Sequence, residues 1–382
     1  MIYLDNNATT RIDPQVCKKI SVFLEQHYGN PSSLYPIGRD AKESITEARE
    51  NIAEAMGAER SEIIFTGSGT ESDNFAIKGV MEAHPEKNEL VTSAIEHPAV
   101  IETALYMRKL GKKVTFIPVD EYGTVDLDML EKKVTQKTAL VSIMHANNEI
   151  GTLQPIKHIV HIAKKKNALV HSDAVQTYGK IDFDVHKLGV DLVSVSAHKI
   201  YGPKGVGALY IKKGTEIQPF IHGGHQEGRL RAGTENTAGI IGFGEAARIA
   251  AQLLKKDKKR LDSLAEQLKN GIESGISDIK FNGSEKERIK TTVNFSFLRL
   301  EAEAVLLALA TKGIFVSTGS ACSEDSDEVS HVLTAIDLTP EQARSCIRFS
   351  IGRFNTEEDI KTVLEELPKI IENLRSISAG TV

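Results

Sequence analysis

The sequence predicts an α/β protein with a mostly parallel sheet, followed by a smaller α+β part. Between residues 14 and 254, short apolar runs alternate with longer segments of helical periodicity. That alternation is typical of a parallel sheet covered by helices on both faces. Beyond residue 254 the alternation stops. The chain has 382 residues, 41% of them hydrophobic, which is enough for one large core or two unequal ones.

Seven short apolar runs are the predicted strands of the sheet. Turn residues bound each of them, as expected for strands. They cover residues 63–65, 90–93, 114–117, 139–144, 168–172, 192–196 and 207–211. Amphipathic stretches such as residues 156–166 lie between them and predict the covering helices.

The second part begins with a charged helical stretch near residue 253. It continues with the strand-like TTVNFSF, a helix from Glu301, the strand-like FVS and IRFSIGRF, and a final helix. Thr356 and Asp359 form a plausible capping box at the start of that last helix. Pro368 is expected to kink or interrupt it.

Charge and cysteine content narrow the function classes. The formal net charge of -5 gives no basic excess, so we expect no direct nucleic-acid or membrane partner. The three cysteines, Cys17, Cys322 and Cys346, match neither a disulfide framework nor a C-x-x-C metal pair. Cys17 and Cys346 are predicted core thiols. With no long apolar stretch or basic leader in MIYLDNNATT, we expect a cytoplasmic protein.

A glycine-rich turn, residues 67–70, connects the strand IIFT to a helix. Backbone N–H groups at a helix start bind phosphate well, although an ordinary strand-to-helix turn has the same pattern. Because no Walker lysine follows and no G-x-G-x-x-G is present, the common nucleotide sites are disfavoured.

Three polar residues follow predicted strands at the edge where α/β sheets bind ligands. Asp173 follows ALVHS, Asn148 follows SIMHAN, and His97 precedes a helix whose first turn contains Pro98. Each also has a structural interpretation: a helix cap for Asp173, a turn asparagine for Asn148, and a structural histidine for His97.

Lys199 and Cys322 are the candidate nucleophiles. Lys199 follows LVSVS, at a strand end where desolvation can lower the pKa of a lysine. Cys322 lies in the small, polar stretch STGSACSEDSDEVSHVL, which predicts an exposed, mobile loop over about residues 319–331. Such a thiol is either reactive or a bystander.

Ten motifs together resemble the NifS/IscS cysteine desulfurases. In chain order they are LDNNATT, YGNPSS, GTESDN, EHPAV, HANNEIGTLQP, HSDAVQTYGK, SAHKIYGPKGVGALY, RAGTEN, STGSACS and IRFSIGRFNTEEDI. The resemblance extends from near Met1 to near Ser376. It implies the fold-type I architecture of enzymes that use pyridoxal 5'-phosphate (PLP). It also implies a homodimer, and a small domain made of residues 1–13 and 255–382 beside a large cofactor domain, residues 14–254.

The resemblance also implies roles for individual residues. Lys199 would form the Schiff base with PLP, and His97 would stack on the ring and shuttle protons. Asp173 would pair with the ring nitrogen, which makes the ring an electron sink. Arg348 would bind the substrate carboxylate with Asn148. The remaining cofactor contacts would come from Gly69, Thr70, Asn148, Gln176, Ser196, Ala197, His198 and, from the other subunit, Thr234.

The implied reaction converts L-cysteine to L-alanine and leaves a persulfide on Cys322. The implied acceptors are an iron-sulfur scaffold protein and tRNA-thiolation proteins. No permanent metal site is visible, although Cys322 is a candidate transient ligand of a forming cluster.

Three stretches depart from the family pattern: the glycine-rich turn, the stretch HGGHQEGRLR and the cysteine loop. Gly69 stands where alanine is common, His225 stands where glycine is usual, and Gly228 and Arg229 are in swapped order. The cysteine loop also continues with four acidic residues, Glu324, Asp325, Asp327 and Glu328. We hypothesise that they select a basic acceptor surface; a solvated charge run is the alternative.

Two other functions stay open at this point. One is a selenocysteine lyase or another fold-type I enzyme that cleaves bonds at the β carbon, and the other is a scaffold that only binds partners. The presence of Lys199, His97, Asp173, Arg348 and Cys322 argues against the scaffold.

Overall fold

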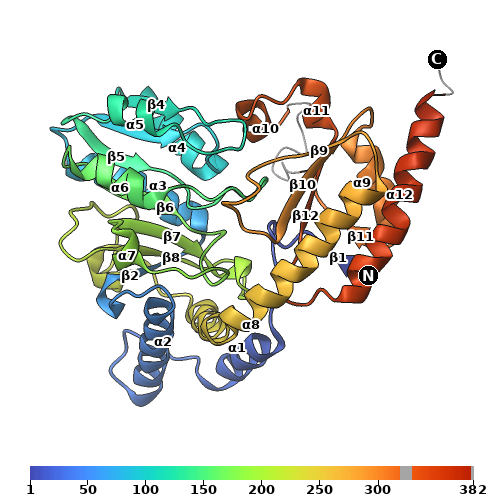
Figure 1. Cartoon of the computed structure of the whole chain (residues 1–382). Helices are drawn as coiled ribbons and strands as arrows, with labels where there is room; N and C mark the ends of the chain where they lie inside the picture. The colour runs from blue at the N-terminus through green and yellow to red at the C-terminus, as the bar shows by residue number, and fades with distance from the viewer. Residues whose placement is uncertain (319–328, 380–382) are drawn as a thin grey trace.

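The computed structural model describes residues 1–318 and 329–379, in which a large sheet-containing part and a smaller part are joined by one long helix (Figure 1). The predicted cysteine loop falls mostly between these two ranges. Cys322 and the four acidic residues after it therefore lie outside the described residues.

The large part is built on a seven-stranded sheet of order β2-β8-β7-β6-β5-β3-β4. Its strands β3 to β7 are parallel, whereas β8 is antiparallel to both β2 and β7. Every predicted strand is confirmed to within two residues. The strands are Ile63–Thr66 (β2), Glu89–Ser93 (β3), Lys113–Ile117 (β4), Thr138–Ser142 (β5), Leu169–Asp173 (β6), Leu192–Ser196 (β7) and Gly207–Ile211 (β8).

Helices cover both faces of this sheet, as predicted. Val91, Val141 and Val193 point to one face and pack with residues of α2, α6 and α8. Their chain neighbours Leu90 and Leu140 point to the other face and pack with α3 and α4, because side chains alternate along a strand. The helices of this part are Pro14–Gln26 (α1), Pro36–Glu54 (α2), Gly69–Ala83 (α3), Pro98–Lys109 (α4), Leu127–Lys133 (α5), Ile156–Lys164 (α6) and Val185–Leu188 (α7).

The smaller part has its own sheets and its own core. One sheet has the order β12-β10-β9, and β1 near the N-terminus pairs with β11. Leu4 joins this core from the N-terminal end of the chain. The elements are Ile2–Tyr3 (β1), Ile279–Phe281 (β9), Thr292–Phe297 (β10), Ile314–Phe315 (β11), Cys346–Ser350 (β12), Ala302–Thr311 (α9), His331–Ala335 (α10), Pro340–Arg344 (α11) and Glu357–Ala379 (α12).

The long helix α8, Thr237–Gly275, begins 16 residues before the predicted start near residue 253. The prediction was wrong because the apolar stretch after Thr237 was assigned to the large part and the charged stretch to a new helix. Ile240 to Ala250 pack in the core of the large part, whereas Leu264 to Ile272 pack in that of the smaller part. One continuous helix therefore belongs to both cores.

Two further expectations are corrected. Pro368 does not interrupt α12, because the helix is continuous through it and Val363, Leu367 and Ile371 bury one face of the helix in the small core. Cys17 is exposed, because α1 turns Val16 and Phe23 inward and Cys17 away. Cys346 is a core thiol, as predicted.

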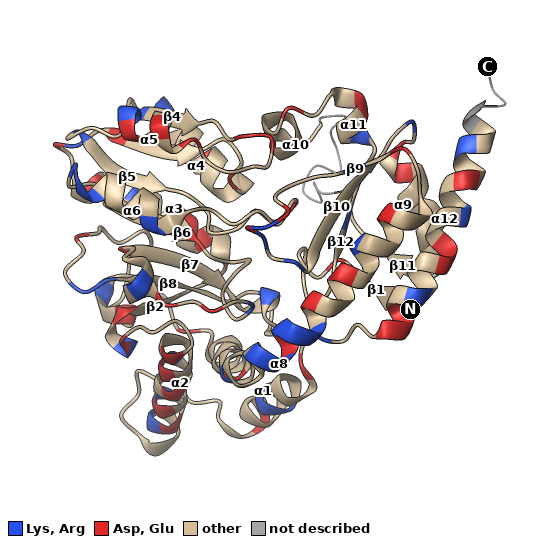
Figure 2. Ribbon diagram, in the orientation of Figure 1, with Lys and Arg blue, Asp and Glu red and all other residues tan. Residues whose placement is uncertain are grey.

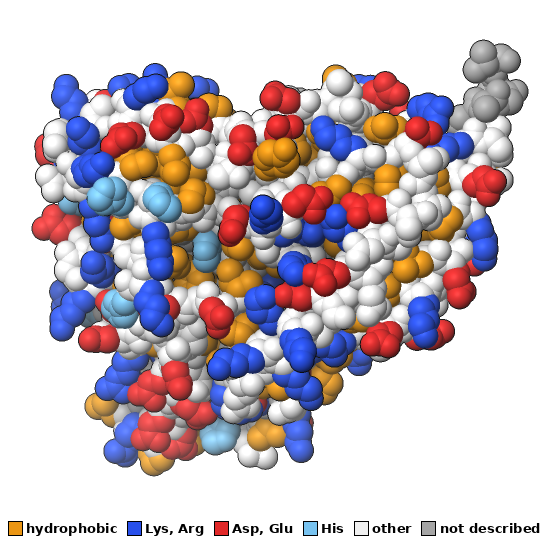
Figure 3. Space-filling model, in the orientation of Figure 1, with side chains coloured by type: hydrophobic (Ala, Val, Ile, Leu, Met, Phe, Trp, Pro, Cys, Tyr) orange, Lys and Arg blue, Asp and Glu red, His pale blue; other side chains and the backbone are white. Residues whose placement is uncertain are grey.

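Charged side chains of both signs cover the helices. Figure 2 shows Lys and Arg interspersed with Asp and Glu along α8 and α12, and both signs are also mixed across the face drawn in Figure 3. Within residues 1–318 and 329–379, no helix is both long and apolar enough to cross a membrane.

Candidate active site

Lys199 lies just beyond the carboxyl end of β7, in a short 3-10 turn. Its Nζ donates to the backbone carbonyls of Asn7, at 2.5 Å, and Ala8, at 2.6 Å. The backbone carbonyl of His198 accepts hydrogen bonds from Thr10 N and Thr10 Oγ1, at 3.0 and 2.9 Å. The N-terminal segment is thus held against the lysine.

Asp173 ends β6, the strand beside β7, so it reaches the same edge of the sheet as Lys199. Only 7% of the residue is exposed, and its Oδ1 accepts from Val175 N at 2.9 Å. Burial raises the pKa of Asp173 to about 6, although the Val175 N–H and the charge on Lys199 oppose the rise. A buried carboxylate that ionises close to neutral pH is suited to hold a cationic ring nitrogen.

Gln176 follows in the turn after Asp173 and points its amide into the same region. Its Nε2 donates to Asn7 O at 3.1 Å, and its Oε1 accepts from Lys180 Nζ at 3.0 Å. Gln176 and Lys199 therefore share the carbonyl of Asn7 as an acceptor.

His97 caps the N-terminus of α4, and its Nδ1 accepts from Ala99 N at 3.1 Å. The proton of the neutral ring is therefore on Nε2. Burial, with smaller contributions from the charges of Lys199 and His331, lowers the pKa of His97 to about 4. The imidazole is neutral at physiological pH.

The glycine-rich turn leads into α3 with Ser68 as the cap. Ser68 Oγ accepts from Glu71 N and Ser68 O from Ser72 N, both at 3.1 Å, which leaves the amides of Gly69 and Thr70 for a ligand. A Cβ at position 69 would lie 2.9 Å from Val175 Cγ2. Glycine thus lets the start of α3 approach the turn that follows Asp173, which gives the departure at Gly69 a physical reason.

The residues after β7 complete this side of the site. Ser196 and Ala197 are buried, and a Cβ at Gly69 would lie 3.5 Å from Ser196 Cβ. His198 Nδ1 lies 3.1 Å from Thr9 Oγ1, and burial lowers the pKa of His198 to about 4. Neutral His198 can donate one hydrogen bond without adding a charge.

Arg348 reaches the site from β12 of the smaller part. The side chain is 2% exposed and donates from Nη1 to Asn148 O at 3.1 Å and from Nη2 to Asp5 Oδ1 at 2.7 Å. Asn7 Nδ2 donates to the same Asn148 carbonyl at 3.0 Å. The structure thus places Arg348 beside the backbone of Asn148, and their joint binding of a substrate carboxylate stays a prediction.

Several residues of the site were missed by the sequence reasoning. Asp5 and Asn7 contact Arg348 and Lys199 across more than a hundred residues, and only their place in LDNNATT hinted at a role. Asp73 is 1% exposed in α3, and burial, followed by the charge of Asp173, raises its pKa well above the usual range. An acidic residue among the apolar positions of that helix was the available signal.

Two predicted residues are not joined to this group. Thr234 is exposed on the segment before α8, and no contact within the described ranges ties it to Lys199. Cys322 lies outside the described residues.

The family model of aminotransferase class-V matches residues 2–363. The chain belongs to this family. A protein of Dictyoglomus turgidum named "Cysteine desulfurase IscS" is 50% identical over 378 residues, which cover 99% of this chain and 96% of that protein. A namesake from Methanosarcina thermophila is 46% identical over 381 residues, 100% of this chain and 94% of that protein. A solved structure titled "NIFS-LIKE PROTEIN" superposes with a TM-score of 0.92 at 41% identity, covering 98% of this chain and 100% of its own.

PLP is the cofactor of class-V aminotransferases, and the site of this family member fits it. Lys199 offers an amine at a strand end, and Asp173 offers a buried carboxylate on the adjacent strand. The amides of Gly69 and Thr70 at the start of a 15-residue helix suit a phosphate group.

Proposed function

We propose that this class-V aminotransferase relative is a cysteine desulfurase, which converts L-cysteine to L-alanine and passes the sulfur on as a persulfide of Cys322. The main structural support is that Lys199 and Asp173 lie at the ends of the adjacent strands β7 and β6. Arg348 is held in the same region by Asp5 and Asn148. The relatives named above support the choice of reaction, and so does a solved structure titled "SspA in complex with cysteine", 35% identical with a TM-score of 0.81.

Each residue has a task that its surroundings favour. Arg348 is always charged and can hold the substrate carboxylate through two parallel hydrogen bonds. Lys199 holds the cofactor and moves the α-proton, and neutral His97 can give and take a proton at Nε2. When bound, PLP supplies an electron sink for the substrate carbon.

Sulfur transfer is assigned to Cys322. Its thiolate attacks the substrate sulfur, a sulfur-sulfur bond forms, and the carbon-sulfur bond breaks with its electron pair left on carbon. Protonation of that carbon gives alanine. The acceptors we propose are an iron-sulfur scaffold protein and tRNA-thiolation proteins, in the cytoplasm.

We also propose a homodimer in which the partner subunit's Thr234 completes the cofactor site. Leu24, Tyr28 and Leu34, which lie close together in the chain between α1 and α2, are 62%, 80% and 89% exposed, and a second copy would cover such apolar side chains. Light scattering of the purified protein measures the mass, and a monomer would refute the dimer.

The decisive experiment gives the PLP-loaded protein L-cysteine, traps the persulfide on Cys322 and measures alanine. We expect alanine from the wild type, almost none from Cys322→Ser, and no visible cofactor band in Lys199→Ala. If the wild type made no more alanine than Cys322→Ser, the function would be wrong. A selenocysteine lyase would be favoured if the wild type did not act on cysteine and Cys322→Ser still cleaved selenocysteine.

A further inference from the structure

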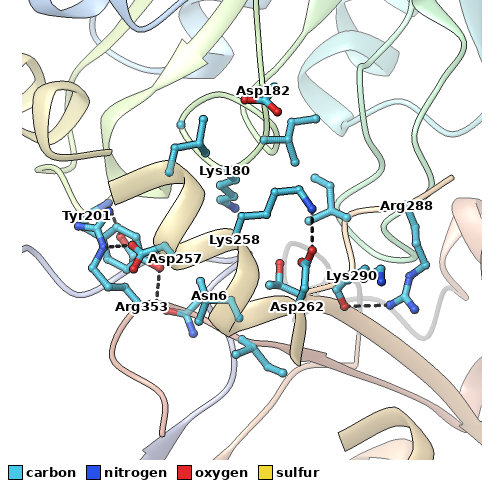
Figure 4. Close-up of a pocket in the computed structure, with 18 of the residues that line it drawn as sticks. Asn6, Lys180, Asp182, Tyr201, Asp257, Lys258, Asp262, Arg288, Lys290 and Arg353 are labelled. Carbon is cyan, nitrogen blue, oxygen red and sulfur yellow. Dashed lines mark hydrogen bonds and ion pairs between the residues drawn. The ribbon is translucent and has the colours of Figure 1, made fainter. Parts of the chain in front are cut away.

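Lys180 is a cation beside the candidate site that the proposed reaction does not use. It belongs to the turn that follows Asp173, four residues after Gln176, and its Nζ donates to Gln176 Oε1 at 3.0 Å. On its other side Lys180 lines a cavity of about 280 Å³ between the large part, α8 and the smaller part (Figure 4). The lysine thus stands between this cavity and the site.

The two neighbours of the Gln176 amide determine its orientation. An ammonium group only donates hydrogen bonds and a backbone carbonyl only accepts them. Because Lys180 lies on one side of the amide and Asn7 O on the other, Oε1 must face Lys180 and Nε2 must face Asn7. Asn7 O also accepts from Lys199, so the N–H side of Gln176 is the side that faces the reactive lysine.

We infer that Lys180 is a positioning residue, which holds the Gln176 amide with its N–H directed toward the Lys199 site. This inference rests on the proposed function and on the family resemblance, which implies that Gln176 donates to the phenolic oxygen of PLP. A rotated amide would present its oxygen to that acceptor, and two oxygens facing each other repel. Lys180 therefore acts through Gln176 and does not touch the cofactor.

Burial supports this role. Gln176 is 7% exposed and Asn7 is 6% exposed, so few water molecules can replace a lost partner of the amide. Burial, with smaller contributions from the charges of Lys199 and Arg348, lowers the pKa of Lys180 to about 7, and below that pH the side chain is an ammonium group. Burying the charged amine of Lys180 lowers the stability of the folded protein, and an apolar side chain of the same length would avoid this loss.

Other charged groups also surround Lys180 from the cavity side. They come from the segment after it, from α8, and from the segments that precede β10 and follow β12 in the smaller part. The charged groups that line the cavity are Asp182, Asp257, Lys258, Asp262, Arg288, Lys290 and Arg353. Of these, Arg353 is paired with Asp257, and Lys258 with Asp262 (Figure 4). Arg353 is also paired with Asp13. Substituting Lys180 leaves these pairs in place.

The test compares Lys180→Met with Lys180→Arg in the PLP-loaded protein. Methionine keeps the length of the side chain without a donor or a charge, whereas arginine keeps both. The readout is the pH midpoint at which the visible band of the cofactor bound to Lys199 changes. Loss of the Gln176 donor and of a nearby positive charge favours the protonated nitrogen, so the midpoint should rise by about 1 pH unit in Lys180→Met. In Lys180→Arg it should stay close to the wild-type value.

The outcomes separate the possibilities. A Lys180→Met protein that binds PLP with the wild-type midpoint would overturn the inference, even if its thermal stability fell, because a merely structural lysine affects stability alone. If Lys180→Met does not fold, Lys180→Leu provides a second side chain without a donor or a charge, with the same expected rise. A wild-type protein that never shows the band would refute the proposed function first, and the role of Lys180 with it.

Discussion

At the residue scale, His97 combines a structural and a chemical task in one ring. Nδ1 is committed to the N-terminus of α4, which leaves Nε2–H for the site. Burial favours the neutral ring, so the pKa is about 4 in the folded protein and near its ordinary value of 6.5 in the unfolded chain. The stabilisation linked to neutral His97 is therefore complete above pH 6.5 and is lost as the pH falls through about 4.

His97→Asn tests this linkage, since asparagine is a good N-cap but does not titrate. Without PLP, we expect the wild type to lose about 2 kcal/mol more unfolding free energy than His97→Asn between pH 7 and pH 4, a figure reduced for the partial exposure of the ring. Urea unfolding of both proteins across this range measures the difference. The other histidines are common to both proteins and cancel. Parallel pH curves would show that His97 is not held neutral.

At the element scale, the sequence predicted the sheet well because each strand is a local pattern. Apolar runs and strand-end residues such as Asp173 and Lys199 can be located from their immediate neighbours. The contacts that hold the site could not be read in this way. Asp5 contacts Arg348 and Asn7 contacts Lys199 only after segments far apart in the sequence fold together, and the periodicity of the sequence carries no information about such contacts.

The segment before α8 shows how one side chain can anchor a whole element. Glu227, Gly228 and Arg229 have φ angles of 45°, 63° and 71°, so two residues with side chains, Glu227 and Arg229, adopt the left-handed region on either side of Gly228. Glu227 holds this backbone in place. Its carboxylate accepts two hydrogen bonds from Arg49, both at 2.6 Å, and one from Phe65 N of the edge strand β2, at 2.8 Å.

Glu227→Ala should therefore cost about 3 kcal/mol of unfolding free energy, because it leaves Arg49 and a strand amide without this acceptor. The matched control is Glu50→Ala, also on the α2 side, whose partner Arg60 is 62% exposed. That exposed pair should contribute less than about 1 kcal/mol. Chemical denaturation of both variants measures the losses, and similar values would mean that Glu227 does not anchor the segment.

At the scale of the whole molecule, the two cores divide the chain in a way that supports the proposed domains, residues 14–254 on one side and residues 1–13 with 255–382 on the other. The large core takes buried residues of α8 up to Ala250, and the small core takes them from Leu264 onward. Between these limits α8 is mostly exposed. The helix α8 therefore connects the two cores through its continuous backbone.

Lys256→Pro interrupts α8 between the two cores. Proline removes a helical hydrogen bond and costs about 3 kcal/mol, but exposed Lys256 contributes to neither core. In the absence of PLP, we expect the wild type and Lys256→Ala to unfold in one calorimetric transition. Lys256→Pro should unfold in two transitions, because each core keeps its own contacts while the coupling between the cores weakens. A single transition of Lys256→Pro at a lower temperature would contradict this expectation. It would mean that the large and small parts unfold as one cooperative unit, held together by the N-terminal segment and Arg348 rather than by α8.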